Sequence, residues 1–162
     1  MLLPSTPVRF LVRFILVWLL SLLALAAFPQ VERLAIVATL KSISLAATLL
    51  RIPCQITNSS VQLAGAKLEI IMDCTPIMAT AALWSAMIAF PARGRWRALG
   101  MAGGLMVLWF YNIIRVLILA FVLARHPRWF DFVHIYLWQT LTLGVVGVIF
   151  VLWAVVERRQ LI

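Results

Sequence analysis

Charged side chains are scarce in this chain. Asp, Glu, Lys and Arg make up 12% of its 162 residues, and only five residues are acidic. Soluble domains carry about 25% charged residues, whereas 65% of this sequence is hydrophobic. The composition therefore excludes an ordinary soluble domain and predicts an integral membrane protein.

Cysteine is also rare: the chain contains only Cys54 and Cys74. No Cys-x-x-Cys pair is present, which argues against a thiol–disulfide oxidoreductase. Two cysteines in an oxidising compartment often pair, so a structural Cys54–Cys74 disulfide is one interpretation. A free, reactive thiol at Cys74 is the other.

The net charge of +9 comes from basic residues that are scattered between apolar runs rather than gathered in one stretch. This pattern is typical of the charges that set membrane topology. We therefore expect membrane lipid as a partner and no nucleic acid.

Four apolar runs predict membrane-spanning helices, each of which needs about 20 mostly apolar residues. The runs are Phe10–Phe28, Thr75–Phe90, Ala98–Val122 and Phe132–Val156. The first has a basic start, as a cleavable signal peptide does. It is longer than a usual signal core and no small-x-small cleavage site clearly closes it, which favours a retained anchor.

The segment Val31–Ile52 mixes charged and apolar residues. Five apolar residues recur there at helical spacing: Leu34, Val37, Ala38, Leu45 and Leu49. This spacing predicts an amphipathic helix that lies on the membrane, and a fifth span is the alternative.

The chain turns polar from Cys54 to Asp73 and contains turn residues. Val61–Leu63 and Leu68–Met72 alternate as short strands do. We expect a small β-meander that rests on the bilayer and delivers Cys74 to the start of a helix.

Three basic clusters decide the expected topology. They are Arg9 with Arg13, then Arg93 with Arg95 and Arg97, and finally Arg158 with Arg159. The positive-inside rule places all three in the cytoplasm. An even number of spans must then separate the first cluster from the second, so Val31–Ile52 should not cross. The sequence thus predicts a single all-α membrane-embedded domain over residues 1–162, with about four transmembrane helices, an extracytoplasmic amphipathic helix and the β-meander.

On this topology Cys74, Arg115 and His134 all fall at the extracytoplasmic ends of spans. Cysteine attacks as the thiolate, which a helix N-terminus or a nearby cation favours. Arg115 can stabilise a developing oxyanion, or only snorkel to the membrane interface. His134 can transfer protons, or simply bond to backbone at the interface.

Two further residues support this set. Asn112 lies one helical turn before Arg115 and can add a hydrogen bond at the same place. Asp131 lies three residues before His134 on the same helix face. It can fix the imidazole tautomer, as the third member of a nucleophile–base set does. His126, in the connecting loop, is a weaker candidate.

At these positions the chain resembles the exosortase/archaeosortase family of membrane transpeptidase-like cysteine proteases. That family has a cysteine just before a span, an Asn-x-x-Arg stretch late in the next span and a histidine at the start of the following one. Here they read Asp73-Cys74-Thr75, Asn112-Ile-Ile-Arg115-Val116 and Phe132-Val-His134. The similarity covers roughly Ala46 to the C-terminus, and the short chain resembles the compact members of the family, such as the exosortase H branch. The family commonly has a glycine two residues after the cysteine, where this chain has Pro76.

The resemblance implies a cysteine protease/transpeptidase at the extracytoplasmic face of the bacterial cytoplasmic (inner) membrane. Its partners would be exported proteins with a C-terminal recognition motif, a hydrophobic span and a basic tail. Cys74 would form a thioester, His134 would move the proton and Arg115 would stabilise the oxyanion, with no metal or organic cofactor. The alternative is a non-enzymatic membrane assembly protein with a structural Cys54–Cys74 disulfide.

Overall fold

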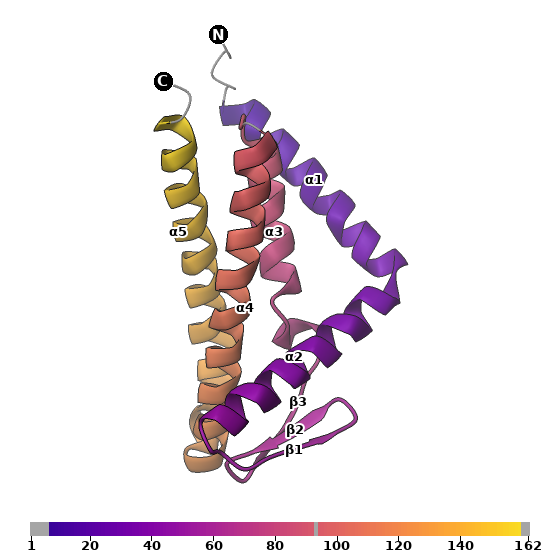
Figure 1. The fold of residues 1–162 in the computed structure, drawn as a ribbon, viewed down its shortest axis with the longest axis vertical. Coiled ribbons are helices and arrows are strands. Elements are labelled where there is room, and N and C mark those ends of the chain that lie inside the picture. Colours follow the sequence, from indigo (N-terminus) through magenta and orange to yellow (C-terminus); the bar gives the residue numbers. More distant parts are fainter. Residues whose placement is uncertain (1–6, 93, 160–162) are drawn as a thin grey trace.

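Five helices and a small sheet make up the computed structural model, which describes residues 7–92 and 94–159. The helices are α1 (Pro7–Ala27), α2 (Pro29–Leu49), α3 (Ile77–Ala89), α4 (Gly94–Arg125) and α5 (Trp138–Arg159). The strands are β1 (Cys54–Thr57), β2 (Ser60–Leu63) and β3 (Ala66–Glu69). Short helical segments at Met72–Cys74, Pro127–Trp129 and Phe132–Leu137 complete the described chain. The helices form an elongated bundle with the sheet at one end (Figure 1).

Among the described residues, three helices are long and apolar enough to cross a membrane: α1, α4 and the helical stretch Pro127–Arg158, which contains α5 except its last residue. The expected helical chain with apolar helices of membrane-spanning length is therefore confirmed. The predicted span Thr75–Phe90 forms the shorter helix α3, whose 13 residues reach about 20 Å. Helix α3 is therefore shorter than the hydrocarbon core of a bilayer, which is roughly 30 Å thick.

Prolines at both ends explain the shortness of α3. Thr75 and Phe90 are extended, with ψ angles of 159° and 138°, and each precedes a proline. The ring of a proline disfavours helical dihedrals in the residue before it. The helix therefore cannot include Thr75 or Phe90.

Aromatic side chains join α1, α5 and the end of α3. The start of α1, the end of α3 and the end of α5 lie at the same end of the bundle (Figure 1). Phe150 of α5 lies against Phe10 of α1 and against Phe90 at the end of α3, with ring centroids 6.0 and 5.8 Å apart. Trp153 of α5 meets Phe90 at 5.7 Å. Arg97 of α4 donates to the carbonyl of Phe90 at 3.1 Å, so the start of α4 lies at this end too.

The helix α2 buries one face against the sheet end of the bundle. Its buried residues are Ala35, Thr39, Leu40, Ile43 and Ala47. Four of the five apolar residues that indicated an amphipathic helix lie on the exposed side: Leu34, Val37, Leu45 and Leu49. The helix is thus apolar on both faces, and it is not among the three helices suited to cross a membrane. Its position on a membrane surface stays a prediction.

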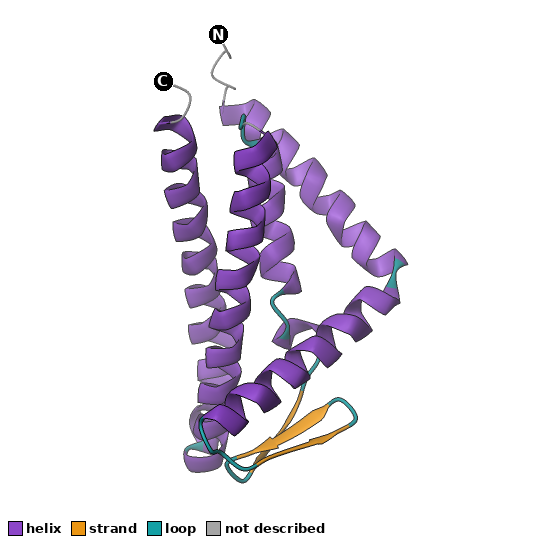
Figure 2. Ribbon diagram, in the orientation of Figure 1, coloured by secondary structure: helices purple, strands orange, loops and turns teal. Residues whose placement is uncertain are grey.

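The three strands form an antiparallel meander in the order β1-β2-β3, as expected for the region Cys54–Asp73 (Figure 2). Ala64 and Gly65 link β2 to β3 with φ angles of 50° and 86°, and two positive φ angles are what a tight hairpin turn requires. The last strand ends at Glu69 rather than continuing to Met72.

The sheet closes a core with α2 and α4. Val61, Leu63 and Ile70 are buried together with Ile43 of α2 and Val116 of α4. Cys54 and Cys74 both pack at the margin of this core. The chain segment that follows β3 is therefore held between the sheet and the middle of α4.

Candidate active site

Cys74 ends a single 3₁₀ turn, Met72–Cys74, between β3 and α3. Its N–H donates to the carbonyl of Ile71 at 2.9 Å, and the N–H of Thr75 donates to that of Met72 at 2.9 Å. The expectation that Cys74 directly precedes a helix is wrong by two residues, because Thr75 and Pro76 come between. Cys74 lies in its own turn.

Thr75 joins that turn to α3. Its hydroxyl donates to the carbonyl of Met72 at 2.7 Å and accepts from the N–H of Ile77 at 3.4 Å. The residue is buried, and it satisfies one of the unpaired N–H groups at the helix start. Sequence reasoning did not single it out, although a threonine before a helix is a recognisable capping signal.

Two buried residues of α4 hold the backbone around Cys74. The side-chain amide of Asn112 donates to the carbonyl of Cys74 at 2.8 Å. The Arg115 guanidinium donates through Nη1 to the carbonyl of Asp73 at 3.3 Å. Three residues apart on a helix, these side chains project from one face, and so they reach two consecutive carbonyls of the turn. Their predicted roles beside a developing oxyanion stay predictions.

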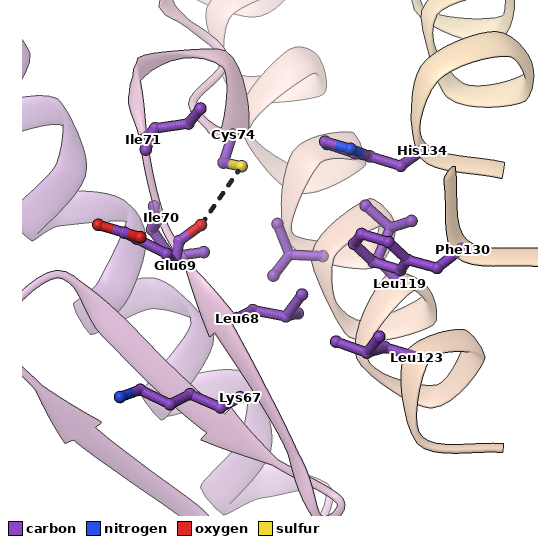
Figure 3. A pocket seen from close by; sticks show the side chains of 11 residues that line it. Lys67, Leu68, Glu69, Ile70, Ile71, Cys74, Leu119, Leu123, Phe130 and His134 are labelled. Atoms are coloured by element: carbon purple, nitrogen blue, oxygen red, sulfur yellow. Dashed lines mark hydrogen bonds between the residues drawn. The ribbon is translucent and has the colours of Figure 1, made fainter. Parts of the chain in front are cut away.

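A cavity of about 230 Å³ opens beside Cys74. Its walls come from β3 and the residues after it, from α4 and from the segment before α5 (Figure 3). The lining residues are Lys67, Leu68, Glu69, Ile70, Ile71, Cys74, Val116, Leu119, Leu123, Phe130 and His134. Cys74 and His134 thus share one mostly apolar cavity, whereas Arg115 and Asn112 lie behind the turn and do not line it.

The thiol and the imidazole approach this cavity from opposite sides (Figure 3). The Cys74 Sγ atom lies 3.9 Å from the carbonyl oxygen of Glu69, a long contact in which the thiol can donate. His134 belongs to the π-helical segment Phe132–Leu137, and such segments are frequent at functional sites.

Phe130 is the residue that stacks on His134. Their ring centroids are 5.4 Å apart with an angle of 22° between the planes. Arg115, Asp131 and Asp73 are the charged groups near enough to act on the imidazole. No hydrogen bond joins Asp131 to His134 within the described part of the chain, so the predicted orienting role of Asp131 has no direct contact behind it. Sequence reasoning missed Phe130, although it lies four residues before His134, a spacing that places two side chains on one helix face.

Both cysteines are free thiols. Cys54 begins β1, where it pairs in register with Leu63. The structure therefore does not contain the Cys54–Cys74 disulfide on which the non-enzymatic alternative rests. His126 is exposed and lies outside the residues that line the cavity.

Within residues 7–92 and 94–159, no three His, Cys, Asp or Glu side chains gather as a metal site would require. Comparison with protein-family models, with curated proteins and with solved structures finds no match for this chain. The resemblance to the exosortase/archaeosortase family therefore rests on its short sequence motifs alone.

Proposed function

We propose that this chain is a membrane-embedded cysteine protease/transpeptidase that cleaves C-terminal sorting signals of exported proteins. One observation carries the proposal: Cys74 and His134, 60 residues apart in sequence, line the same cavity. A nucleophile and a proton acceptor in one cavity are the minimum for covalent acyl transfer.

In the proposed reaction His134 takes the proton from the Cys74 thiol, and Sγ attacks the carbonyl carbon of the scissile peptide bond. The C–N bond of the tetrahedral intermediate then breaks, and the leaving amine receives the proton from His134. The acyl group remains on Cys74 as a thioester. Water or an amine acceptor next gives a proton to His134 and attacks the thioester, and the Cys74 sulfur leaves and regains that proton.

Arg115 contributes positive charge close to this chemistry. Its Nη1 atom is bonded to the carbonyl of Asp73, and its Nε atom is buried without a hydrogen-bond partner among the described residues. The guanidinium therefore has donor capacity left for a developing oxyanion, and a cation in an apolar site is effective there. Direct contact requires the guanidinium to turn from Asp73 toward the cavity.

The position of the cavity along α4 supports a site at the membrane surface. Asn112 lies 18 residues after Gly94, about 27 Å along the helix axis at 1.5 Å per residue. This distance is close to the roughly 30 Å of a hydrocarbon core. If the basic residues Arg95 and Arg97 mark the cytoplasmic end, Cys74 lies near the opposite, extracytoplasmic interface of the inner membrane.

The test is co-expression with an exported reporter that ends in a randomised short segment, an apolar helix and a Lys/Arg tail. We expect the chain to process a subset of reporters and to form a covalent adduct that hydroxylamine releases, because thioesters react with that amine. Cys74→Ala should stop processing while the protein still accumulates. Cys54→Ser is the matched thiol control and should process normally.

If no reporter from the library is processed, or if Cys74→Ala processes as well as the native chain, the protease proposal fails. His134→Ala should also prevent formation of the adduct, because no other imidazole lines the cavity. An adduct that forms at the native rate without His134 would remove the acid–base role.

A further inference from the structure

The outer strand β3 has one edge that no strand pairs with among the described residues, and residues of this strand line the cavity. The sheet order β1-β2-β3 places β3 at the margin. Residues 67 to 71, which include most of β3 and its continuation, all line the cavity beside Cys74. Figure 3 shows this segment running toward Cys74, with His134 and Phe130 across the cavity from it.

The register tells which main-chain groups lie on the open edge. The N–H of Ile70 donates to the carbonyl of Ser59 at 2.8 Å, so Ser59 and Ile70 form a hydrogen-bonded pair with β2. Such pairs alternate along an antiparallel ladder, and Leu68 with Val61 is the next one. Lys67 and Glu69 therefore turn their N–H and C=O groups away from β2. The contact of Cys74 Sγ with the carbonyl of Glu69 agrees with this direction.

We propose that the substrate binds as an added strand on the open edge of β3, through the main chain of Lys67 and Glu69. This inference rests on the proposed function for the identity of the occupant: the extended segment of the exported protein that precedes its hydrophobic span. Edge-strand addition gives affinity through main-chain hydrogen bonds and leaves specificity to side-chain pockets. The cavity, at about 230 Å³, is smaller than typical ligand pockets of roughly 300–1,000 Å³. It suits one apolar side chain of a ligand whose backbone lies along the edge.

The direction of the added strand follows from the two chains. β3 runs toward Cys74, which in the proposed orientation lies at the membrane interface. The substrate segment also runs toward the membrane, because its hydrophobic span follows it. The two strands are therefore parallel. A substrate N–H that bonds the carbonyl of Glu69 replaces the thiol there and leaves the Cys74 proton to His134.

The experiment compares two prolines on opposite edges of one sheet. Proline removes an N–H and is tolerated in strands only where that N–H points outward. Lys67 meets this condition on β3. Ile56 meets it on β1, because it faces Val61 and Val61 directs its own hydrogen bonds to β3. Each proline is placed in a Cys74→Ala background, which prevents cleavage, and the proteins are reconstituted in lipid nanodiscs.

The probe is a displayed library of random eight-residue peptides, scored by enrichment over empty nanodiscs. We expect peptides enriched on Cys74→Ala to lose at least about tenfold in binding on Lys67→Pro, because one main-chain bond and the space for a strand are lost. Binding to the Ile56→Pro variant should stay within about twofold of binding to the Cys74→Ala parent protein. Equal effects of the two prolines, or no enrichment at all, would overturn the inference.

A second measurement leaves the sheet untouched. In an enriched peptide, each amide is replaced in turn by an ester, which removes one N–H. Strand addition predicts weaker binding at every second position, whereas a uniform or absent effect contradicts it. If alternation is found but the native chain cleaves no reporter carrying that peptide, the proposed function fails and the strand site stands. If a peptide binds only by bridging two copies of the chain, the complex will have twice the mass expected for one copy. That result would overturn the single-strand site.

Discussion

Asn112 reaches across 38 residues of sequence to donate a hydrogen bond to the carbonyl of Cys74 at 2.8 Å. Its side chain is buried, and the bond fixes the backbone of the proposed nucleophile from the neighbouring helix. Because the partner is the main chain, the bond acts on where Cys74 lies and leaves its thiol free.

Asn112→Ala should therefore displace Cys74 more than it unfolds the protein. A buried carbonyl left unpaired costs about 1–3 kcal/mol, and the turn can relieve this cost by moving. We expect the rate of Cys74 alkylation, measured in a Cys54→Ser background, to change severalfold. Thr142→Val is the control, since it removes a hydroxyl that contacts Tyr111 and donates to the carbonyl of Trp138, and neither Thr142 nor Tyr111 lines the cavity. If both variants alkylate at the native rate, Asn112 does not position Cys74.

Arg115→Lys separates a transition-state contact from a structural one. A lysine can replace one bond to the carbonyl of Asp73 as a point charge, but it lacks the planar fork of the guanidinium. If Arg115 stabilises the oxyanion, reporter processing should fall by about 10²–10³ in turnover with little change in substrate binding. Near-native turnover in the lysine variant would reduce Arg115 to support of the turn.

The close approach of α4 and α5 makes Gly100 sensitive to any side chain. A Cβ atom there would collide with the Trp153 ring, whose N–H donates to the carbonyl of Trp96 at 3.2 Å. Gly100→Ala should cost about 1–3 kcal/mol by overpacking and lower the thermal denaturation midpoint in detergent. Gly103→Ala is the matched control, because nothing lies within 4 Å of its Cβ position. A higher midpoint for Gly100→Ala would contradict the close packing of Gly100 against Trp153.

Reporter fusions test the orientation on which the site's location depends. Fusions after Arg97 should report the cytoplasm, and those at Gly65 and Pro127 should report the exterior. The sheet, whose β2–β3 turn contains Gly65, and the connection between α4 and α5, which contains Pro127, lie at the end of the bundle opposite the start of α1 (Figure 1). A cytoplasmic signal at Gly65 would place the cavity at the wrong face for exported substrates.

Much of the architecture could be predicted from apolar runs and turn residues in the sequence. Long apolar runs predicted α1, α4 and α5, and turn residues with alternation predicted the meander. The convergence of Cys74 and His134 followed from their placement at corresponding ends of predicted spans, and both line one cavity.

Other features depend on tertiary context. The buried face of α2 could not be predicted, because the helix has apolar residues on both sides and Leu34 is as hydrophobic as Leu40. The π-helical segment Phe132–Leu137 was not predicted, because no spacing in the sequence indicates it. The stacking of Phe130 on His134 could have been expected, since residues four apart share one helix face. The start of α3 was predictable in principle, since Pro76 restricts Thr75, but the apolar pattern continues through both residues and hides the boundary.

Pro76 lowers the conformational entropy that the chain next to Cys74 loses on folding. A proline narrows the conformations open to itself and to the residue before it in the unfolded chain as well as in the folded one. The link between the Cys74 turn and α3 therefore gives up less conformational entropy on folding, and α3 does not extend back to include Cys74. Part of the order around the proposed nucleophile is therefore set by the covalent structure of Pro76, two residues after Cys74.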